Sequence, residues 1–216
     1  MKTSLMLVFL LLLGGCVSSW PVTSEIVVYH ELPGSIRHQR FAFLPDKDQE
    51  GSLEYNAFAN RIRAKFRIFG LEETSIEEAD LLLSLHYGID AGHDVQEPHP
   101  ILGTTGYNTT HLPGTVTRTG DTVTVTPGTT ISTPTIGVVG VTSTTATIYT
   151  RTLTLDILDN ASRKQGKTRK VLESKVVSSG TSRMMAAVIP VMIDALFTEF
   201  PGKSGKPRIV ELPMEF

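Results

Sequence analysis

The sequence predicts an α+β fold, in which a largely antiparallel sheet packs against two helices. Three patterns indicate this fold: short runs rich in β-branched and aromatic residues, two amphipathic helical stretches, and a long threonine-rich segment between strands. Hydrophobic residues make up 40% of the 216 residues, which excludes wholesale disorder. The formal net charge of −2 argues against a nucleic-acid partner, because such proteins normally carry a strongly basic face. The single cysteine excludes an intramolecular disulfide and a Cys-based metal cluster.

The N-terminus has the pattern of a secretion signal that ends at a lipid-modified cysteine. Lys2 supplies a positive charge, and residues 5–13 form an apolar run that is too short to span a membrane. The sequence Leu13-Gly14-Gly15-Cys16 resembles the lipobox of bacterial lipoproteins. This resemblance implies cleavage after Gly15, with diacylglycerol and palmitate on Cys16 and no other cofactor. An ordinary signal peptide with an unmodified cysteine is the alternative.

The residues after Cys16 indicate where such a lipoprotein would reside. No Asp follows Cys16, which is similar to outer-membrane lipoproteins if the source is Gram-negative. We therefore expect a lipid-anchored protein on the periplasmic side of the outer membrane. Its parts would be a signal peptide at residues 1–15, a tether at 16–23, and one domain at 24–216 with an insertion at about 104–145.

The first half of the domain predicts two strands, a helix and a third strand. Residues 25–32 and 40–44 are strand-like runs separated by Pro33-Gly34. A helix over about 52–69 would bury one face with helical spacing: Tyr55, Phe58, Ala59, Ile62, Phe66 and Phe69. Its basic residues lie largely off this face, and we interpret them as solvent-exposed: Arg61, Arg63, Lys65 and Arg67. Residues 81–89 alternate in polarity, as a half-buried strand does.

The second half predicts two paired strands and a last helix. Strand 147–158 would place Tyr149, Leu153, Leu155 and Ile157 toward the core. A turn at Asp159-Asn160 would lead to the partner strand at 171–178. The helix at about 182–200 would bury Met185, Val188, Ile189, Met192, Leu196 and Phe200, with a kink at Pro190.

Between the two long strands lies a threonine-rich segment. Residues 104–150 hold 19 of the 27 threonines but only two charged residues, Arg118 and Asp121. The segment alternates like strands around Gly120-Asp121, so a projecting β-hairpin is plausible, and disorder is the alternative.

Several motifs resemble the domain of unknown function 4136 family of bacterial lipoproteins. They are the strand beginning Glu78-Ala79-Asp80-Leu81, the strand Phe41-Ala42-Phe43-Leu44-Pro45, and the helix that exits through Phe200-Pro201-Gly202. The resemblance covers residues 39–90 and 147–216. It implies an α+β domain in the cell envelope and brings no known activity.

The candidate chemistry is sparse. His86, His93, His99 and His111 lie near several carboxylates and could share a metal ion, although their spacing matches no defined site. No nucleophile motif or phosphate-binding glycine loop occurs, and we interpret the hydroxyl-rich run from Ser178 to Ser182 as helix capping. Candidate partner contacts are Arg118 and Asp121 in the threonine-rich segment and Arg163, Lys164 and Lys167 in the last turn between strands.

These patterns favour a non-catalytic binding or scaffold role in the envelope. We expect the acyl chains to anchor the protein in the membrane, and the threonine-rich segment to contact an envelope protein or a second copy of this chain. A metal-binding protein and a hydrolase of cell-wall or lipid substrates are the alternatives.

Overall fold

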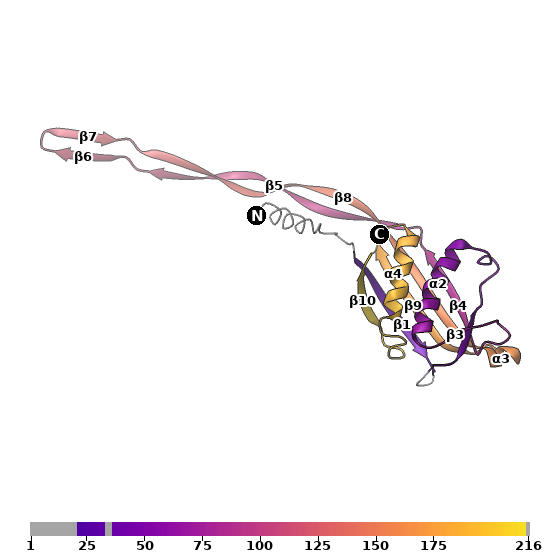
Figure 1. Ribbon diagram of the computed structural model, residues 1–216. Helices are drawn as coiled ribbons and strands as arrows, with labels where there is room; N and C mark the ends of the chain where they lie inside the picture. The colour runs from indigo at the N-terminus through magenta and orange to yellow at the C-terminus, as the bar shows by residue number, and fades with distance from the viewer. Residues whose placement is uncertain (1–20, 33–35, 215–216) are drawn as a thin grey trace, which may run out of the picture. The chain divides into compact units, whose positions relative to one another are not determined.

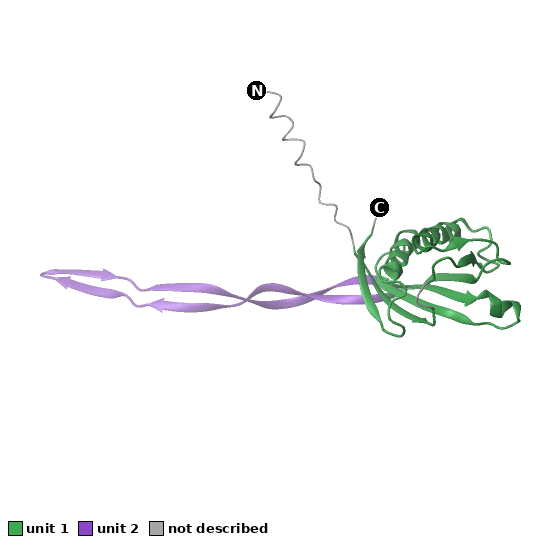
Figure 2. Ribbon diagram, turned by 60° about the horizontal axis from the view of Figure 1, so that its bottom comes forward, with its two compact units in different colours: residues 1–93, 148–216 green, residues 94–147 purple. Residues whose placement is uncertain are grey.

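The computed structural model describes residues 21–32 and 36–214 (Figure 1). The predicted signal peptide, the lipobox and Cys16 lie outside these residues. The chain divides into two units, which Figure 2 distinguishes by colour. Unit 1 takes the described residues of Met1–His93 and Ile148–Phe216, and unit 2 is Asp94–Thr147.

Unit 1 is built on one sheet with the strand order β10-β1-β9-β8-β4-β2-β3. The strands are β1 (Pro21–His30), β2 (Arg40–Phe43), β3 (Glu72–Glu73), β4 (Leu81–Ile89), residues 148–159 of β8 (Thr129–Asp159), β9 (Lys170–Gly180) and β10 (Arg208–Pro213). The four pairings from β10 to β4 are antiparallel, whereas β2 lies parallel to both β3 and β4. The predicted α+β class and largely antiparallel sheet are therefore confirmed. β1 begins earlier than expected and includes residues 21–23, which the sequence places in the predicted tether.

Helix α2 (Leu53–Ile68) packs its predicted face into the core. Ser52 caps the helix, because its Oγ accepts a hydrogen bond of 3.2 Å from the backbone N–H of Tyr55. Five of the six predicted side chains are buried and Phe69 is partly buried. Buried rings of α2 meet those of the sheet and of the last helix; the centroid of Phe66, for example, lies 5.4 Å from those of Phe41 and Phe197.

Helix α4 (Met185–Phe197) lies with α2 on one face of the sheet (Figure 1). It is shorter than the predicted helix and has Pro190 inside it. Because it packs against both the sheet and α2, it also buries side chains outside the predicted stripe: Val191, Ile193, Ala195 and Phe197. Among the described residues, no helix combines the length and the apolar composition that crossing a membrane requires.

The predicted turn at Asp159-Asn160 is instead the start of a short helix, α3 (Asn160–Lys164). The Asp159 carboxylate accepts a hydrogen bond of 2.9 Å from the backbone N–H of Ser162 and so caps this helix. A small second cluster, which contains Ala42, Ala79 and Leu82, packs separately from the main core.

Unit 2 is a two-stranded ribbon, so the hairpin alternative holds for the threonine-rich segment (Figure 2). Strand β5 (His93–Leu112) pairs with β8, and β6 (Thr115–Thr119) pairs with β7 (Thr122–Thr126) around Gly120-Asp121, as predicted. We call Asp94–Thr147 the ribbon and residues 115–126 its tip. The ribbon starts about ten residues before the predicted insertion.

Candidate functional site

The ribbon carries most of the large hydrophobic side chains that are exposed in the described chain. Thirteen of the eighteen large hydrophobic side chains that are exposed in the described residues belong to it. They are Val95, Ile101, Leu102, Tyr107, Leu112, Val116, Val123, Val125, Ile131, Ile136, Val138, Val139 and Val141. A monomeric soluble protein seldom gathers exposed apolar side chains in this way, and such a surface typically marks an interaction site.

The backbone of the ribbon also favours a role as an interaction site. A two-stranded hairpin is at best marginally stable alone in water, and each outer edge presents unpaired N–H and C=O groups. Proteins usually block such edges with charges or prolines. In 54 residues the ribbon has only four charged side chains, Asp94, Glu97, Arg118 and Asp121, and its prolines leave long stretches of edge open.

Two Pro-Gly pairs interrupt the ladder between the tip and the rest of the ribbon. They are Pro113-Gly114 and Pro127-Gly128, which separate β5 from β6 and β7 from β8. The two backbones approach so closely here that a Cβ at Gly114 would lie 2.7 Å from the carbonyl oxygen of Thr126. A Cβ at Gly128 would lie 2.8 Å from the carbonyl oxygen of Leu112. Only glycine fits at both places.

The structure does not gather the four histidines into one site. His86 lies on β4, where its ring contacts Ser84 Oγ and Asp46 Oδ2 at 3.0 and 3.3 Å. His93, His99 and His111 are exposed along β5, and Nδ1 of His111 lies 2.9 Å from Oγ1 of Thr130. Within the described residues there is no group of three or more His, Cys, Asp or Glu side chains that could hold a metal ion. The metal hypothesis therefore has no geometric support in this part of the chain.

The predicted partner-contact residues fall in different units. Arg118 and Asp121 belong to the tip of the ribbon, where Arg118 Nε donates a hydrogen bond of 3.4 Å to the carbonyl of Gly120. Arg163, Lys164 and Lys167 are exposed in and after α3 of unit 1. The ammonium of Lys164 donates to the carbonyl oxygen of Glu77 at 2.6 Å. Arg163, Lys164 and Lys167 thus form an exposed basic turn.

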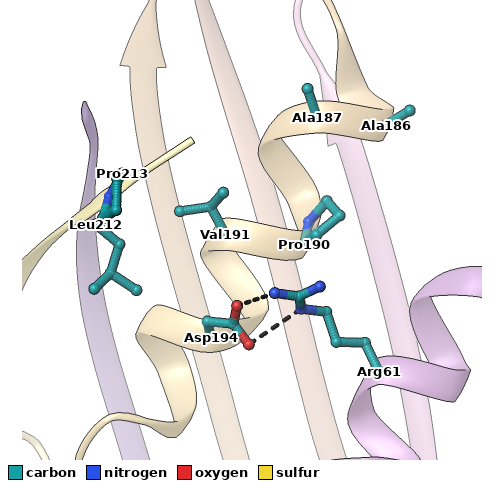
Figure 3. A pocket seen from close by; sticks show the side chains of 8 residues that line it. All are labelled: Arg61, Ala186, Ala187, Pro190, Val191, Asp194, Leu212 and Pro213. Carbon is teal, nitrogen blue, oxygen red and sulfur yellow. Dashed lines mark hydrogen bonds and ion pairs between the residues drawn. The ribbon is translucent and has the colours of Figure 1, made fainter. Parts of the chain in front are cut away.

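Three of the four basic residues of α2 form ion pairs instead of the solvated face that we expected, whereas Arg67 is exposed as predicted. Arg61 and Lys65 both pair with Asp194 of α4, and Arg63 pairs with Glu73 at 2.7 Å. In Figure 3 the guanidinium of Arg61 and the carboxylate of Asp194 face each other. Both line a cavity of about 460 Å³. Burial raises the pKa of Asp194, but the hydrogen bonds and charges of Arg61 and Lys65 together outweigh it, so the pKa lies below its usual value. We interpret this cluster as a link between the two helices.

The hydroxyl-rich run from Ser178 to Ser182 is not the cap that we predicted. The N-cap of α4 is Met184, whose side chain makes no capping bond, and the Oγ of Ser182 accepts a hydrogen bond of 3.2 Å from the backbone N–H of Met184. Part of the run instead surrounds Arg151, a residue of β8 that is only 3% exposed. Its guanidinium donates to the carbonyl oxygens of Ser178 and Ser182 and to the Oγ of Ser178, at 3.2, 2.9 and 3.3 Å.

A signal for Arg151 was present in the sequence. Tyr149, Leu153, Leu155 and Ile157 share one face of the strand, and residue 151 occupies the core-facing position between the first two. A charged residue at a core-facing position of a strand needs partners, and this requirement singles it out. The pairing of Asp194 with α2, in contrast, has no local signal, because Asp194 follows Arg61 by 133 positions in the chain.

Comparisons with known proteins identify a family but no activity. A family model described as "Domain of unknown function (DUF4136)" matches residues 34–202. No curated protein matches the sequence. A solved structure, a PDZ domain protein from Parabacteroides distasonis ATCC 8503, is 14% identical with a TM-score of 0.47. That alignment covers 90% of this chain and 39% of the other, so the chain spans about two fifths of the length of that protein.

Proposed function

Because the chain belongs to the DUF4136 family, whose description assigns no function, we propose its role from its own surface. It is a non-catalytic scaffold protein of the cell envelope that binds a second copy of itself through the ribbon. The observation that carries this proposal is the exposed apolar surface of the ribbon together with its open strand edges.

A second copy is the partner that the composition of the ribbon favours. Strand addition uses backbone groups, so it needs no special side-chain chemistry in the partner beyond an open edge. Every copy of the chain presents the same open edges and the same Thr- and Val-rich surface. With four charged residues over its whole length, the ribbon has little charge to repel an identical ribbon or to select an oppositely charged partner.

Cross-linking in cells that express the chain tests this proposal. A photo-reactive phenylalanine analogue replaces Tyr107 of the ribbon, which is 68% exposed, and in a matched variant it replaces Tyr29 of unit 1, which is 59% exposed. We expect the variant at 107 to yield an adduct of twice the mass of the chain, and the variant at 29 to yield little. An adduct with a different envelope protein would contradict self-association, and equal labelling from both positions would contradict the role of the ribbon.

The proposed location depends on Cys16. A mature chain with two or three acyl chains on this residue stays in the membrane, since each buried CH₂ contributes about 0.8 kcal/mol. Radiolabelled palmitate should therefore enter the wild-type chain and not Cys16→Ser. Equal incorporation into both chains would contradict lipidation at this residue, and fractionation of the labelled cells would report whether the outer membrane holds the protein.

A further inference from the structure

We propose that the cavity beside Arg151 binds a phosphate ester that carries an apolar chain. The cavity has a volume of about 390 Å³ and lies in unit 1. This volume is within the range of about 300–1,000 Å³ that is usual for small-molecule sites. Its wall combines a buried cation, exposed hydroxyl groups and an apolar side, and each of these recognises a different part of such a ligand.

The cation is the guanidinium of Arg151. Its five N–H groups make three hydrogen bonds, all to uncharged oxygens of Ser178 and Ser182, which leaves two N–H groups for a ligand. No carboxylate among the described residues forms a salt bridge with Arg151. Asp90 is the acidic group whose charge acts on it, and Oδ1 of Asp90 accepts hydrogen bonds from the backbone N–H groups of Thr150 and Gly92. A buried charge without a direct salt bridge is costly, and a bound anion would supply this direct contact.

The guanidinium is held in place before any ligand arrives. Its hydrogen bonds join β9 to the segment that leads into α4, so the planar group has a fixed orientation. Gly180 lies against it, and a Cβ there would be 3.0 Å from Nη2. A fixed guanidinium suits the paired hydrogen bonds that a phosphate accepts.

The remaining wall has two kinds of side chain. Ser179 and Thr181 bring exposed hydroxyl groups, which can donate to the further oxygens of a phosphate. Val22, Met184 and Met214 make an apolar side, and methionine adapts to flexible chains. An inorganic anion would leave this apolar side unused, which is why we infer an apolar chain on the phosphate.

The source of the ligand is a lipid headgroup. Pro21 also lines the cavity and follows Cys16 by five residues. Five residues of fully extended chain span at most about 18 Å. If Cys16 is lipidated, the cavity therefore lies close to the membrane surface. This choice of source rests on the proposed lipidation, whereas the site itself does not.

Calorimetric titration of the full chain in a nonionic detergent, which carries no phosphate group, tests the site. The probes are hexyl phosphate, inorganic phosphate and hexanol, with detergent micelles without protein as the blank. We expect saturable binding of hexyl phosphate, weaker binding of phosphate and the weakest binding of hexanol. Hexanol binding as tightly as hexyl phosphate would show that the site does not recognise the phosphate charge, which would overturn the proposal. Equal affinity for hexyl phosphate and inorganic phosphate would overturn the inference of an apolar chain and indicate a site for free phosphate.

Variants locate the binding in this cavity. Arg151→Met should weaken hexyl phosphate by about tenfold to 100-fold, since it removes hydrogen bonds to a charged group. Met184 is 61% exposed, so Met184→Gln should fold normally and weaken hexyl phosphate more than inorganic phosphate. Ile68→Gln, at an exposed apolar residue of α2, is the matched control and should bind as the wild type does.

A measurement on the wild-type chain covers the case in which Arg151→Met does not fold. Hexyl phosphate should shift the methyl resonances of Met184 and Met214 and leave that of Met192, which is buried in the core and does not line the cavity, unchanged. Unshifted Met184 and Met214 signals at saturation would overturn the proposal. Because these probes are water-soluble, a failure of palmitate labelling would remove the lipid source without affecting this result.

Discussion

Asn160 shows how one polar side chain secures the end of the sheet. It is fully buried, and its Nδ2 donates to the carbonyl oxygens of Ile76 and Ala79 at 2.7 and 2.8 Å. Its backbone N–H donates to the carbonyl of Asp80 at 3.0 Å. Three backbone carbonyls that precede β4 are therefore bonded to this one residue.

Replacing Asn160 by Asp should destabilise the chain more than replacing it by Ala. Asn160→Ala loses two buried hydrogen bonds, at a cost of about 1–3 kcal/mol. Asn160→Asp also places carboxylate oxygens against carbonyl oxygens and buries a charge, so its cost should be larger. Urea unfolding measures the free energy of unfolding of both variants, with Asn56→Asp, at an exposed position, as the control. Equal stability of the two variants at position 160 would contradict this account.

Asp194 should make the stability of unit 1 depend on pH. Its folded-state pKa is lowered by the hydrogen bonds and charges of Arg61 and Lys65, which outweigh the effect of burial. A lowered pKa gives a stabilisation that is fully present above the unfolded pKa of about 3.9 and is lost as the pH falls through the folded pKa.

Asp194→Asn should therefore lower the free energy of unfolding by about 2 kcal/mol at pH 7, since Arg61 and Lys65 then lose their charged partner. The difference from wild type should shrink below about pH 3, where the wild-type carboxyl also becomes neutral. Thermal unfolding at pH 7 and pH 2.5 measures this, and the exposed Glu50→Gln is the control. An equal loss at both pH values would show that the charge of Asp194 contributes nothing.

At the scale of single elements, the Pro-Gly pairs of the ribbon determine how its tip is held. The close backbone approach at Gly114 and Gly128 leaves no room for a side chain, whereas nothing lies within 4 Å of the position that a Cβ at Gly106 would occupy. Gly128→Val should therefore separate β6 and β7 from the rest of the ribbon, and Gly106→Val should not.

Amide hydrogen exchange of residues 115–126 measures this effect. We expect exchange at the tip to accelerate about tenfold or more in Gly128→Val, because a valine would have to displace backbone atoms, and the melting temperature of unit 1 to stay unchanged. Unaltered exchange in Gly128→Val, or equal acceleration in Gly106→Val, would contradict the role assigned to the close approach.

Elements with a strong local period were predictable from the sequence. The buried stripe of α2 follows from the spacing of apolar residues, and the turn at Gly120-Asp121 follows from its residues. The alternation predicted for β4 holds only after Leu83, because Leu82, on the other face, is buried against Ala42 and Ala79. The start of the ribbon was missed because Pro98 and Pro100 argue against a strand. A ribbon with open edges tolerates prolines that a central strand would not.

At the scale of the whole molecule, the pairing of strands that lie far apart in the sequence was the part that the sequence could not reveal, whereas the pairing of the neighbouring strands β8 and β9 was predicted. β10 and β1 are neighbours in the sheet although they lie near opposite ends of the sequence, and β2 lies parallel to both β3 and β4. A short strand has no local feature that names its partner, because pairing depends on backbone groups that every residue shares. The buried Arg151 was missed for a different reason, since the residues that hold it, Ser178 and Ser182, were assigned to a cap.

The division into two units predicts which part of the chain the fold needs. The main core lies entirely in unit 1, with side chains from the sheet, α2 and α4. The described ribbon residues are exposed or only partly buried. Replacing residues 104–143 by a short Gly-Ser linker should therefore leave a folded domain whose melting temperature falls little, as circular dichroism would show.

The mass of the full chain in solution, compared with that of this deletion variant, tests the central claim most directly. Sedimentation velocity in a nonionic detergent measures both. The account predicts that the full chain sediments as a dimer or larger assembly and that the folded deletion variant sediments as a monomer. A deletion variant with the same number of copies as the full chain, or a full chain that is monomeric at all concentrations, would contradict it.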